Sequence, residues 1–128
     1  MTGEQIGISR FKAKKEFHDV IEKDLRKFMD FESAHPEIYH YSSTRYYNMD
    51  VPGTDDEEYW MFIDHFKSYE DYRDSLYQAT HSPENKEGQR LMAQSLAHAS
   101  GTFAEDRNPA EIEHWIEVPS LRVDNQGH

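Results

Sequence analysis

The chain has 128 residues, of which 36% are hydrophobic and 13% aromatic, which suits one domain with a core built on large rings. Its 25 acidic residues outnumber 14 Lys and Arg, and the net charge of −11 repels nucleic acid and anionic membranes, so neither is an expected partner. The absence of cysteine excludes disulfides, thiolate nucleophiles and cysteine metal sites. We expect a single domain over 1–128, with an ordered core at about 5–120 and a tail at 121–128.

The sequence indicates neither a leader nor a membrane anchor. Residues Met1 to Gln5 lack the basic and apolar regions of a signal peptide. No apolar run approaches the ~20 residues of a membrane-spanning helix. The expected location is cytoplasmic.

The first half of the chain shows a strand, a helix and a second strand. A short strand is predicted at Gln5–Lys12, and a helix follows at about Lys14–Ser33. The Lys, Glu and Asp residues of this helix are expected to face solvent, because the apolar ones recur at helical spacing. His35-Pro36 ends the helix, since the residue before a proline is pushed away from helical angles. The Tyr-rich run Tyr39–Met49 predicts the second strand.

The second half begins with a hairpin connection and a buried strand. The acidic connection Val51–Glu58 leads into a strand at Tyr59–Phe66, and Ser68 with Asp71 has the spacing of a helix capping box. The helix that follows presents Tyr69, Tyr72, Leu76 and Thr80 on one face.

A second helical segment and a last strand complete the pattern. Ser82-Pro83 is expected to start the helical segment, and Gly101 to end it. Alternation over Ile112–Val118 predicts the last strand. One side of the segment is expected to carry Leu91, Met92, Ser95, Leu96 and Ala99.

The element order is strand–helix–strand–strand–helix–strand, which predicts an α+β fold of the ferredoxin-like βαββαβ kind. In this fold the helices cover one face of the sheet. Aromatic residues occupy both faces of the second and third strands, so the other face also needs a partner. Two such sheets packed face to face would form a homodimer.

The chain resembles the dimeric α/β-barrel superfamily, which contains antibiotic-biosynthesis and haem-degrading monooxygenases. The resemblance spans Ile6 to Val118 and is most specific at His35-Pro36 and at Phe66–Tyr72. The run Leu76–Pro83 is also similar to the helix break of small aromatic-polyketide cyclases. The resemblance implies a dimeric α/β barrel that acts on a small molecule.

The catalytic set of the cofactor-free monooxygenases is not retained. The resemblance implies a Trp where this chain has Phe66, and an Asn in the first strand, which offers Gly7 and Ser9. It implies a helical His near Gln89. His81 and His98 are imperfect substitutes for that histidine.

Asp64 and His65 are candidate catalytic residues within the apolar strand. They are consecutive, so their side chains point to opposite faces, and only one can reach a pocket under the helices. Arg45 is the expected bidentate partner of the carboxylate. One interpretation is a structural ion pair at the sheet, and the other is a general acid or base in the pocket.

The other candidates are histidines and large aromatic residues. His81 is either a catalytic residue at the pocket rim or an exposed turn residue, and His98 is either a pocket residue, a haem ligand or a surface residue. His114 is either a core or interface histidine or a pocket base. Tyr47 and Trp60 could line a pocket for a planar ligand. No histidine spacing supports a metal site, so we expect no metal and no cofactor other than haem.

Three functions are compatible with these residues. The first is an enzyme resembling cofactor-independent monooxygenases, which deprotonates an aromatic or polyketide-like substrate that then reacts with oxygen. The second is an acid–base cyclase or isomerase of the same fold. The third is a ligand-binding or stress-related dimer without catalytic activity.

Overall fold

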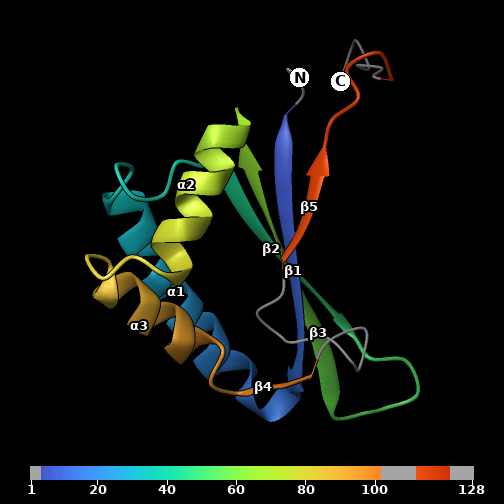
Figure 1. Ribbon diagram of the computed structural model, residues 1–128. Coiled ribbons are helices and arrows are strands. Elements are labelled where there is room, and N and C mark those ends of the chain that lie inside the picture. The colour runs from blue at the N-terminus through green and yellow to red at the C-terminus, as the bar shows by residue number, and fades with distance from the viewer. Residues whose placement is uncertain (1–3, 102–111, 122–128) are drawn as a thin grey trace, which may run out of the picture.

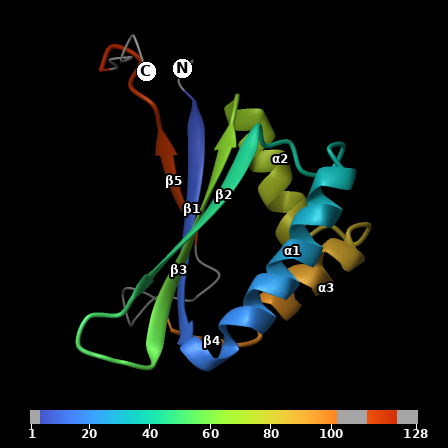
Figure 2. The same ribbon diagram turned by 180° about the vertical axis from the view of Figure 1, so that it is seen from behind.

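The computed structural model describes residues 4–101 and 112–121 and contains one antiparallel sheet with helices on one face (Figures 1 and 2). Among the described residues, no helix covers the opposite face of the sheet (Figure 2). The elements in chain order are β1 (Gln5–Lys14), the 3₁₀ turn η1 (Lys15–Phe17), α1 (His18–Ala34), β2 (Ser43–Asp50), β3 (Glu57–Phe66), α2 (Tyr69–Thr80), α3 (Lys86–Ser95), β4 (Ala99–Gly101) and β5 (Ile112–Ile116).

The sheet has the order β2-β3-β1, and the outer edge of β1 is shared by two short strands. The strand β5 pairs with the first half of β1, and β4 pairs with its end. The α+β ferredoxin-like fold is therefore confirmed, with the predicted last strand found as β5. The predicted tail lies almost entirely outside the described residues.

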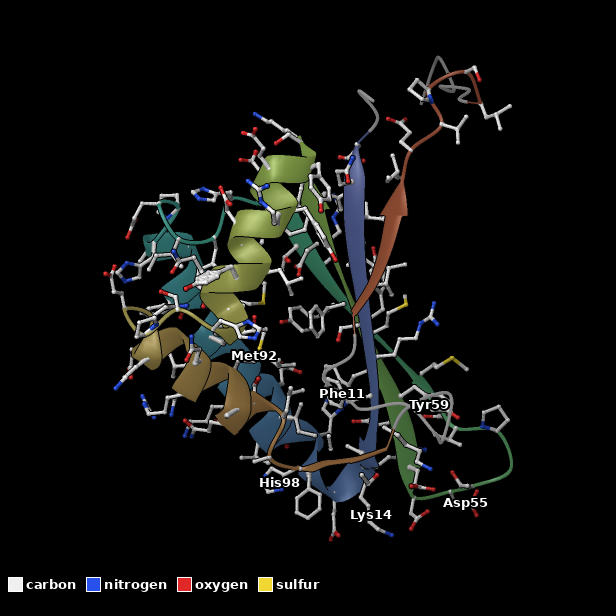
Figure 3. The ribbon with its side chains drawn as sticks, in the orientation of Figure 1. Phe11, Lys14, Asp55, Tyr59, Met92 and His98 are labelled. Atoms are coloured by element: carbon white, nitrogen blue, oxygen red, sulfur yellow. The ribbon has the colours of Figure 1, made fainter. Side chains whose placement is uncertain are left out.

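Alternation along β1 explains how the sheet separates two environments. Gln5, Gly7, Ser9, Phe11 and Ala13 are buried on the helix side, while the residues between them keep part of their exposure. On β3 the helix side carries Glu58, Trp60, Phe62, Asp64 and Phe66. Figure 3 shows Met92 and Tyr59 on opposite sides of the sheet.

Two clusters of buried residues join the helices to the sheet. One contains Phe11, Ala13, Ile21, Leu25 and Trp60, at the end where α1 begins. The other contains Phe28, Tyr39 and Leu91, which join the end of α1 to α3. At the start of α2, the Ser68 Oγ accepts a hydrogen bond from the Asp71 backbone N–H at 3.1 Å, as the capping spacing predicted.

The structure corrects the predicted bounds in the second half of the chain. Pro83 does not open a helix: residues 82–85 form a turn closed by the Asn85 N–H to the Ser82 carbonyl, and α3 begins at Lys86. Ala99 and Gly101 belong to β4, not to a helix, so Gly101 ends no helical segment. The amphipathic period continued past Ser95 in the sequence, but the backbone turns there to reach the edge of β1.

The second strand also starts later than predicted, at Ser43 rather than Tyr39. Tyr39 and Tyr41 lie in the connection from α1, and both turn inward. The Ser75 Oγ accepts a hydrogen bond from the His40 backbone N–H at 2.8 Å, which fixes this connection against α2.

Candidate functional site

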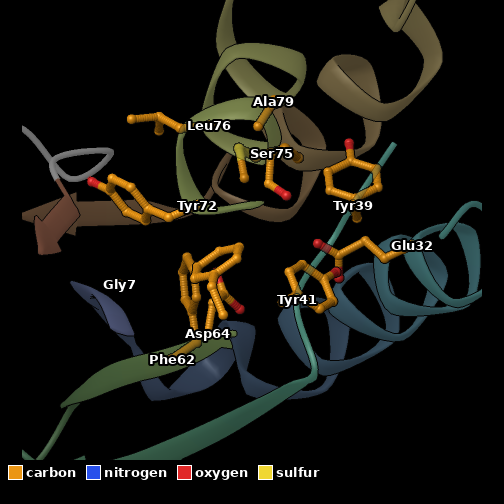
Figure 4. Close-up of a pocket in the computed structure, with 12 residues that line it drawn as sticks. Gly7, Glu32, Tyr39, Tyr41, Phe62, Asp64, Tyr72, Ser75, Leu76 and Ala79 are labelled. Carbon is orange, nitrogen blue, oxygen red and sulfur yellow. The ribbon is translucent and has the colours of Figure 1, made fainter. Parts of the chain in front are cut away.

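A cavity of about 40 Å³ lies between the sheet, α2 and the connection from α1 to β2. Its wall is mostly apolar and aromatic, and Figure 4 shows how the side chains surround it. The described lining residues are Gly7, Glu32, Tyr39, Tyr41, Phe62, Asp64, Phe66, Tyr72, Ser75, Leu76, Ala79 and Met92. This volume holds a few water molecules at roughly 10–15 Å³ each.

Asp64 lies in the floor of the cavity because its position in β3 puts it on the helix side of the sheet. Its Cα partners are Thr44 on β2 and Gly7 on β1, so the three residues form one row on the helix side of the sheet. Gly7 has no side chain, which leaves space beside the carboxyl. Burial raises the pKa of Asp64 from 3.8 to about 7.

Glu32 approaches the same cavity from the last turns of α1. The sequence pattern predicted that Glu32 faces solvent. This prediction is wrong, because the exposed fraction of Glu32 is only 7%. Burial raises its pKa from 4.5 to about 8, and the nearby Asp64 adds to the rise. Its Oε1 has no hydrogen-bond partner in the described structure.

Two hydroxyls beside these carboxyls are also buried and unpaired within the described residues: those of Tyr41 and Thr44. The Tyr41 hydroxyl lies close enough to Glu32 to oppose part of the rise in its pKa, but without the geometry of a hydrogen bond. Burial and the nearby carboxyls raise the pKa of Tyr41 itself. Buried polar atoms are nearly always paired, so the unpaired oxygens of Glu32 and Tyr41, which both line the cavity, indicate a place there for a polar ligand or water.

The described wall of the cavity contains acids and tyrosines but no Lys or Arg. No positive side chain in the described wall offsets the negative charge that the two carboxyls would carry when ionised. Burial therefore favours their neutral forms. Two neighbouring carboxyls that titrate near neutral pH can act as acid and as base. The site is therefore suited to proton transfer near neutral pH.

Aromatic rings form a continuous wall between the two carboxyls and α2. Tyr41 and Phe66 meet edge to face at 6.0 Å between centroids, and Phe66 and Tyr72 do so at 5.4 Å. Such rings exclude water and offer faces and edges to a planar ligand. On the far side of Glu32, Tyr39 and Tyr41 lies a surface groove of about 260 Å³. Those three side chains therefore separate the cavity from the groove.

Arg45 does not pair with Asp64, which corrects the prediction from the sequence. The Cα partner of Arg45 is Ile63, and directly opposed residues share a face, so Arg45 is on the open side of the sheet while Asp64 is under the helices. His65 is also on the open side, where its Nδ1 lies 3.1 Å from Glu4 Oε1. Tyr47 lies on the same open face and is 46% exposed.

The remaining predicted residues do not line the cavity in the described structure. His81 is an exposed residue at the end of α2, in contact with Thr80 Oγ1 at 2.6 Å. His98 stacks on Phe17 at 4.4 Å, beside β4 (Figure 3). Trp60 is a core residue whose Nε1 donates to Glu58 Oε2 at 2.9 Å.

His114 is placed only by its backbone, which pairs with Gly7. Its side chain lies outside the described residues. Gln89, at the position where the resemblance implied a histidine, donates through Nε2 to the carbonyls of Gln78 and Ser82. Gln89 thus holds the turn between α2 and α3 together.

Sequence reasoning found Asp64 but missed Glu32 and Tyr41. The signal for Glu32 was present, because Ile21, Leu25, Phe28 and Glu32 recur at intervals of three and four residues and lie on one helix face. Tyr41 gave no such signal, since it lies in a connection whose path depends on the contact between His40 and Ser75.

The described part of the chain has no cluster of three metal-ligating side chains. None of its helices combines the length and the apolar character that crossing a bilayer requires.

Comparison with known proteins gives the same fold at low sequence identity. A dimeric ferredoxin-like protein of unknown function from Jannaschia sp. CCS1 is 17% identical, with 91% of this chain and 100% of the other covered at a TM-score of 0.53. A second one, from Bacteroides fragilis NCTC 9343, is 14% identical, with coverages of 90% and 97% and a TM-score of 0.53.

A protein from Bordetella bronchiseptica that is named among the antibiotic biosynthesis monooxygenases is 9% identical, with coverages of 91% and 98% and a TM-score of 0.50. No family model and no curated protein matches the sequence. The resemblance to the dimeric α/β-barrel superfamily is thus confirmed at the level of the fold, and the neighbours from Jannaschia and Bacteroides are dimers.

Proposed function

We propose that the chain is a small-molecule enzyme in which Asp64 is the general base, in the manner of cofactor-independent monooxygenases. The observation that carries this proposal is a carboxyl with a pKa of about 7 in the floor of an aromatic-lined cavity. A base whose pKa lies near the working pH is ionised often enough to act and still accepts protons strongly. The monooxygenase name of a structural neighbour agrees with this chemistry.

The reaction needs a base, an electron-rich substrate and molecular oxygen. Asp64 removes a proton from a CH₂ group activated by an aromatic ring or carbonyl, and the carbanion adds to O₂. The peroxide then loses water and leaves a carbonyl, so that CH₂ and O₂ become C=O and H₂O. An apolar cavity favours this sequence because it keeps bulk water away from the carbanion.

The size of the cavity restricts the proposed substrate to a single-ring aromatic or polyketide-like compound. Even one ring needs more than about 40 Å³, so the wall must yield. Met92 is part of that wall, and its unbranched side chain changes rotamer readily.

Oxygen uptake tests this proposal directly. With a panel of cyclic β-diketones that carry an activated CH₂ group, the unmodified protein should consume oxygen, and Asp64→Asn should reduce the rate by roughly 10²–10⁴. Asp30→Asn, which removes an exposed carboxylate of α1, is the matched control and should leave the rate unchanged. An Asp64→Asn protein that keeps the full rate would show that Asp64 is not the base.

An acid–base isomerase or cyclase is the second candidate, and it is favoured by two neighbouring carboxyls whose pKa values burial raises toward neutrality. With both carboxyls titrating near neutral pH, one group can take a proton while the other supplies one. This reaction consumes no oxygen. Product formation under nitrogen would select the second candidate, and product formation only in the presence of oxygen would select the first.

The proposed assembly is a homodimer in the cytoplasm that uses neither metal nor haem. The neighbours from Jannaschia and Bacteroides are dimers with the same fold. The open face of the sheet exposes Tyr47 and Met49, at 46% and 50%, next to further apolar side chains of β1 and β3. Such a face is suited to packing against a second copy.

A further inference from the structure

We propose that Glu32 and Tyr41 form an oxyanion-binding pair, and that the substrate is an uncharged phenol, enol or ketone whose oxygen they hold. The two residues would hold the negative charge that develops when Asp64 removes a proton. This inference rests on the proposed role of Asp64 as the base. It adds two catalytic residues, and it defines the substrate class by its charge.

The unpaired atoms are the first argument. Glu32 is more than nine-tenths buried and lines the cavity, and neither its Oε1 nor the Tyr41 hydroxyl has a hydrogen-bond partner in the described structure. Figure 4 shows both side chains reaching the cavity from the side opposite Phe62. An unpaired buried group lowers stability, so a ligand that supplies its missing hydrogen bond is favoured.

The protonation state of Glu32 is the second argument. With a pKa of about 8, the carboxyl is mostly neutral at pH 7 and can donate a hydrogen bond from its O–H. A carboxylic acid that an apolar site keeps neutral is a strong donor to an oxyanion. The Tyr41 hydroxyl, with its pKa raised, remains protonated as well. Both groups are therefore donors, although the residue types suggest negative charge.

Conservation of charge defines the substrate class. When a neutral substrate passes its proton to ionised Asp64, the cavity keeps one negative charge, which moves from the carboxylate to the substrate oxygen. While Asp64 is ionised, as the base must be, a substrate that arrives as a carboxylate would add a second negative charge, and the described wall has no Lys or Arg to offset it. The cavity should therefore accept phenols and reject carboxylates of the same shape.

Several other groups face this pair and must be considered in any pH dependence. Asp64 on β3 raises the pKa of Glu32, and both carboxyls raise that of Tyr46 on β2. Tyr39 lies beside Glu32 in the connection, and Tyr72 faces the cavity from α2. On β5, His114 occupies the register position next to Gly7, with a side chain outside the described residues.

Binding of 4-nitrophenol tests the inference without turnover. Its phenolate absorbs visible light and its neutral form does not, so the apparent pKa of the bound probe can be measured. We expect bound 4-nitrophenol to ionise at a lower pH than the free compound. Binding of 4-nitrobenzoate, a carboxylate of similar shape, should be at least about tenfold weaker, equivalent to ~1.4 kcal/mol.

Substitutions in the pair identify the donors. Tyr41→Phe and Glu32→Leu should each weaken phenolate binding by about tenfold and return the pKa of the probe toward its free value. Glu32→Gln keeps an N–H donor and should retain part of the affinity. Tyr47→Phe removes an exposed hydroxyl on the open face and is the matched control, with no expected change. Circular dichroism would verify that each variant is folded.

The outcome also separates this inference from the role of Asp64. If the probe binds with its free pKa, or Tyr41→Phe and Glu32→Leu bind it as well as Tyr47→Phe does, the oxyanion pair is wrong. Asp64→Asn should still bind the phenolate. In the phenolate complex Asp64 has taken up the proton and is neutral, so its replacement by neutral Asn leaves the charge of the complex unchanged. Loss of turnover in Asp64→Asn alongside unchanged phenolate binding in the pair variants would support the base and reject the pair.

Discussion

Glu32 should lower the stability of the fold as the pH rises. In an unfolded chain its pKa is near 4.5, whereas in the folded protein burial holds it at about 8. The folded state thus binds the proton more tightly, and the associated stability is fully present below pH 4.5 and is lost as the pH rises through 8. Asp64 acts in the same direction between 3.8 and about 7.

Replacing Glu32 with Gln should therefore stabilise the protein at alkaline pH. We expect similar free energies of unfolding near pH 5, and a gain for Glu32→Gln on the order of 2–4 kcal/mol at pH 9. Urea unfolding at several pH values would measure this difference. Asp30→Asn removes an exposed charge from the same helix and should follow the unmodified protein. If the free energies of unfolding of Glu32→Gln and of the unmodified protein changed in parallel with pH, the raised pKa of Glu32 would be contradicted.

Most of what could be predicted at single residues came from strand alternation. That Asp64 and His65 face opposite ways follows from geometry alone, and the structure shows which of them faces the helices. The erroneous pairing of Arg45 with Asp64 has a physical cause. A shift of one residue in register changes the face of every side chain, and sequence alone did not specify the register.

Within α3, a buried glycine leaves room for a polar contact between two other elements. Asn85 Nδ2 donates to the Tyr39 hydroxyl at 2.9 Å and to the Gln78 carbonyl at 2.9 Å, which joins the connection from α1 to the turn after α2. A Cβ on Gly88 would collide with both the Tyr39 hydroxyl and Asn85 Oδ1. The helix therefore needs glycine here, although glycine is a weak helix former.

Gly88→Ala should destabilise the protein, against the usual effect of alanine in a helix. Overpacking lowers stability by about 1–3 kcal/mol, whereas the higher helix propensity of alanine raises it by about 1 kcal/mol. A net loss on the order of 1 kcal/mol is therefore expected. Thermal unfolding would measure it. The additional Tyr39→Phe substitution removes one colliding atom and should recover part of the loss. A more stable Gly88→Ala protein would show that the collision relaxes without effect.

At the level of elements, the sequence predicted periodic segments better than the connections between them. The strand β3 and the start of α2 were specified locally, by apolar residues and by the Ser68 cap. The turn at 82–85 was not, because it depends on Asn85 and Gln89 reaching the Gln78 carbonyl. Tyr41 likewise reaches the cavity through a connection held by α2. Contacts between distant segments, which no local pattern reports, define most of the candidate site.

For the whole molecule, the two faces of the sheet present different chemistry. The helix side contains the cavity and both buried clusters. The open side carries Ile63 on β3 between Ile8 and Arg45, its Cα partners on the neighbouring strands. A partly apolar sheet face of this kind suits the proposed packing against a second copy, and two neighbours of the same fold are dimers.

Ile63→Glu should convert the proposed homodimer into a folded monomer. In the monomer the new carboxylate faces Arg45 across the strands, an opposed charge pair that the sheet tolerates. In the dimer the pair would be buried against the second copy, and the desolvation of both charges lowers stability by several kcal/mol. Light scattering at a series of concentrations would report the mass. Val20→Glu places the same charge at a 38% exposed position of α1 and should remain dimeric. A dimeric Ile63→Glu protein, or a monomeric unmodified one, would show that this face is not the interface.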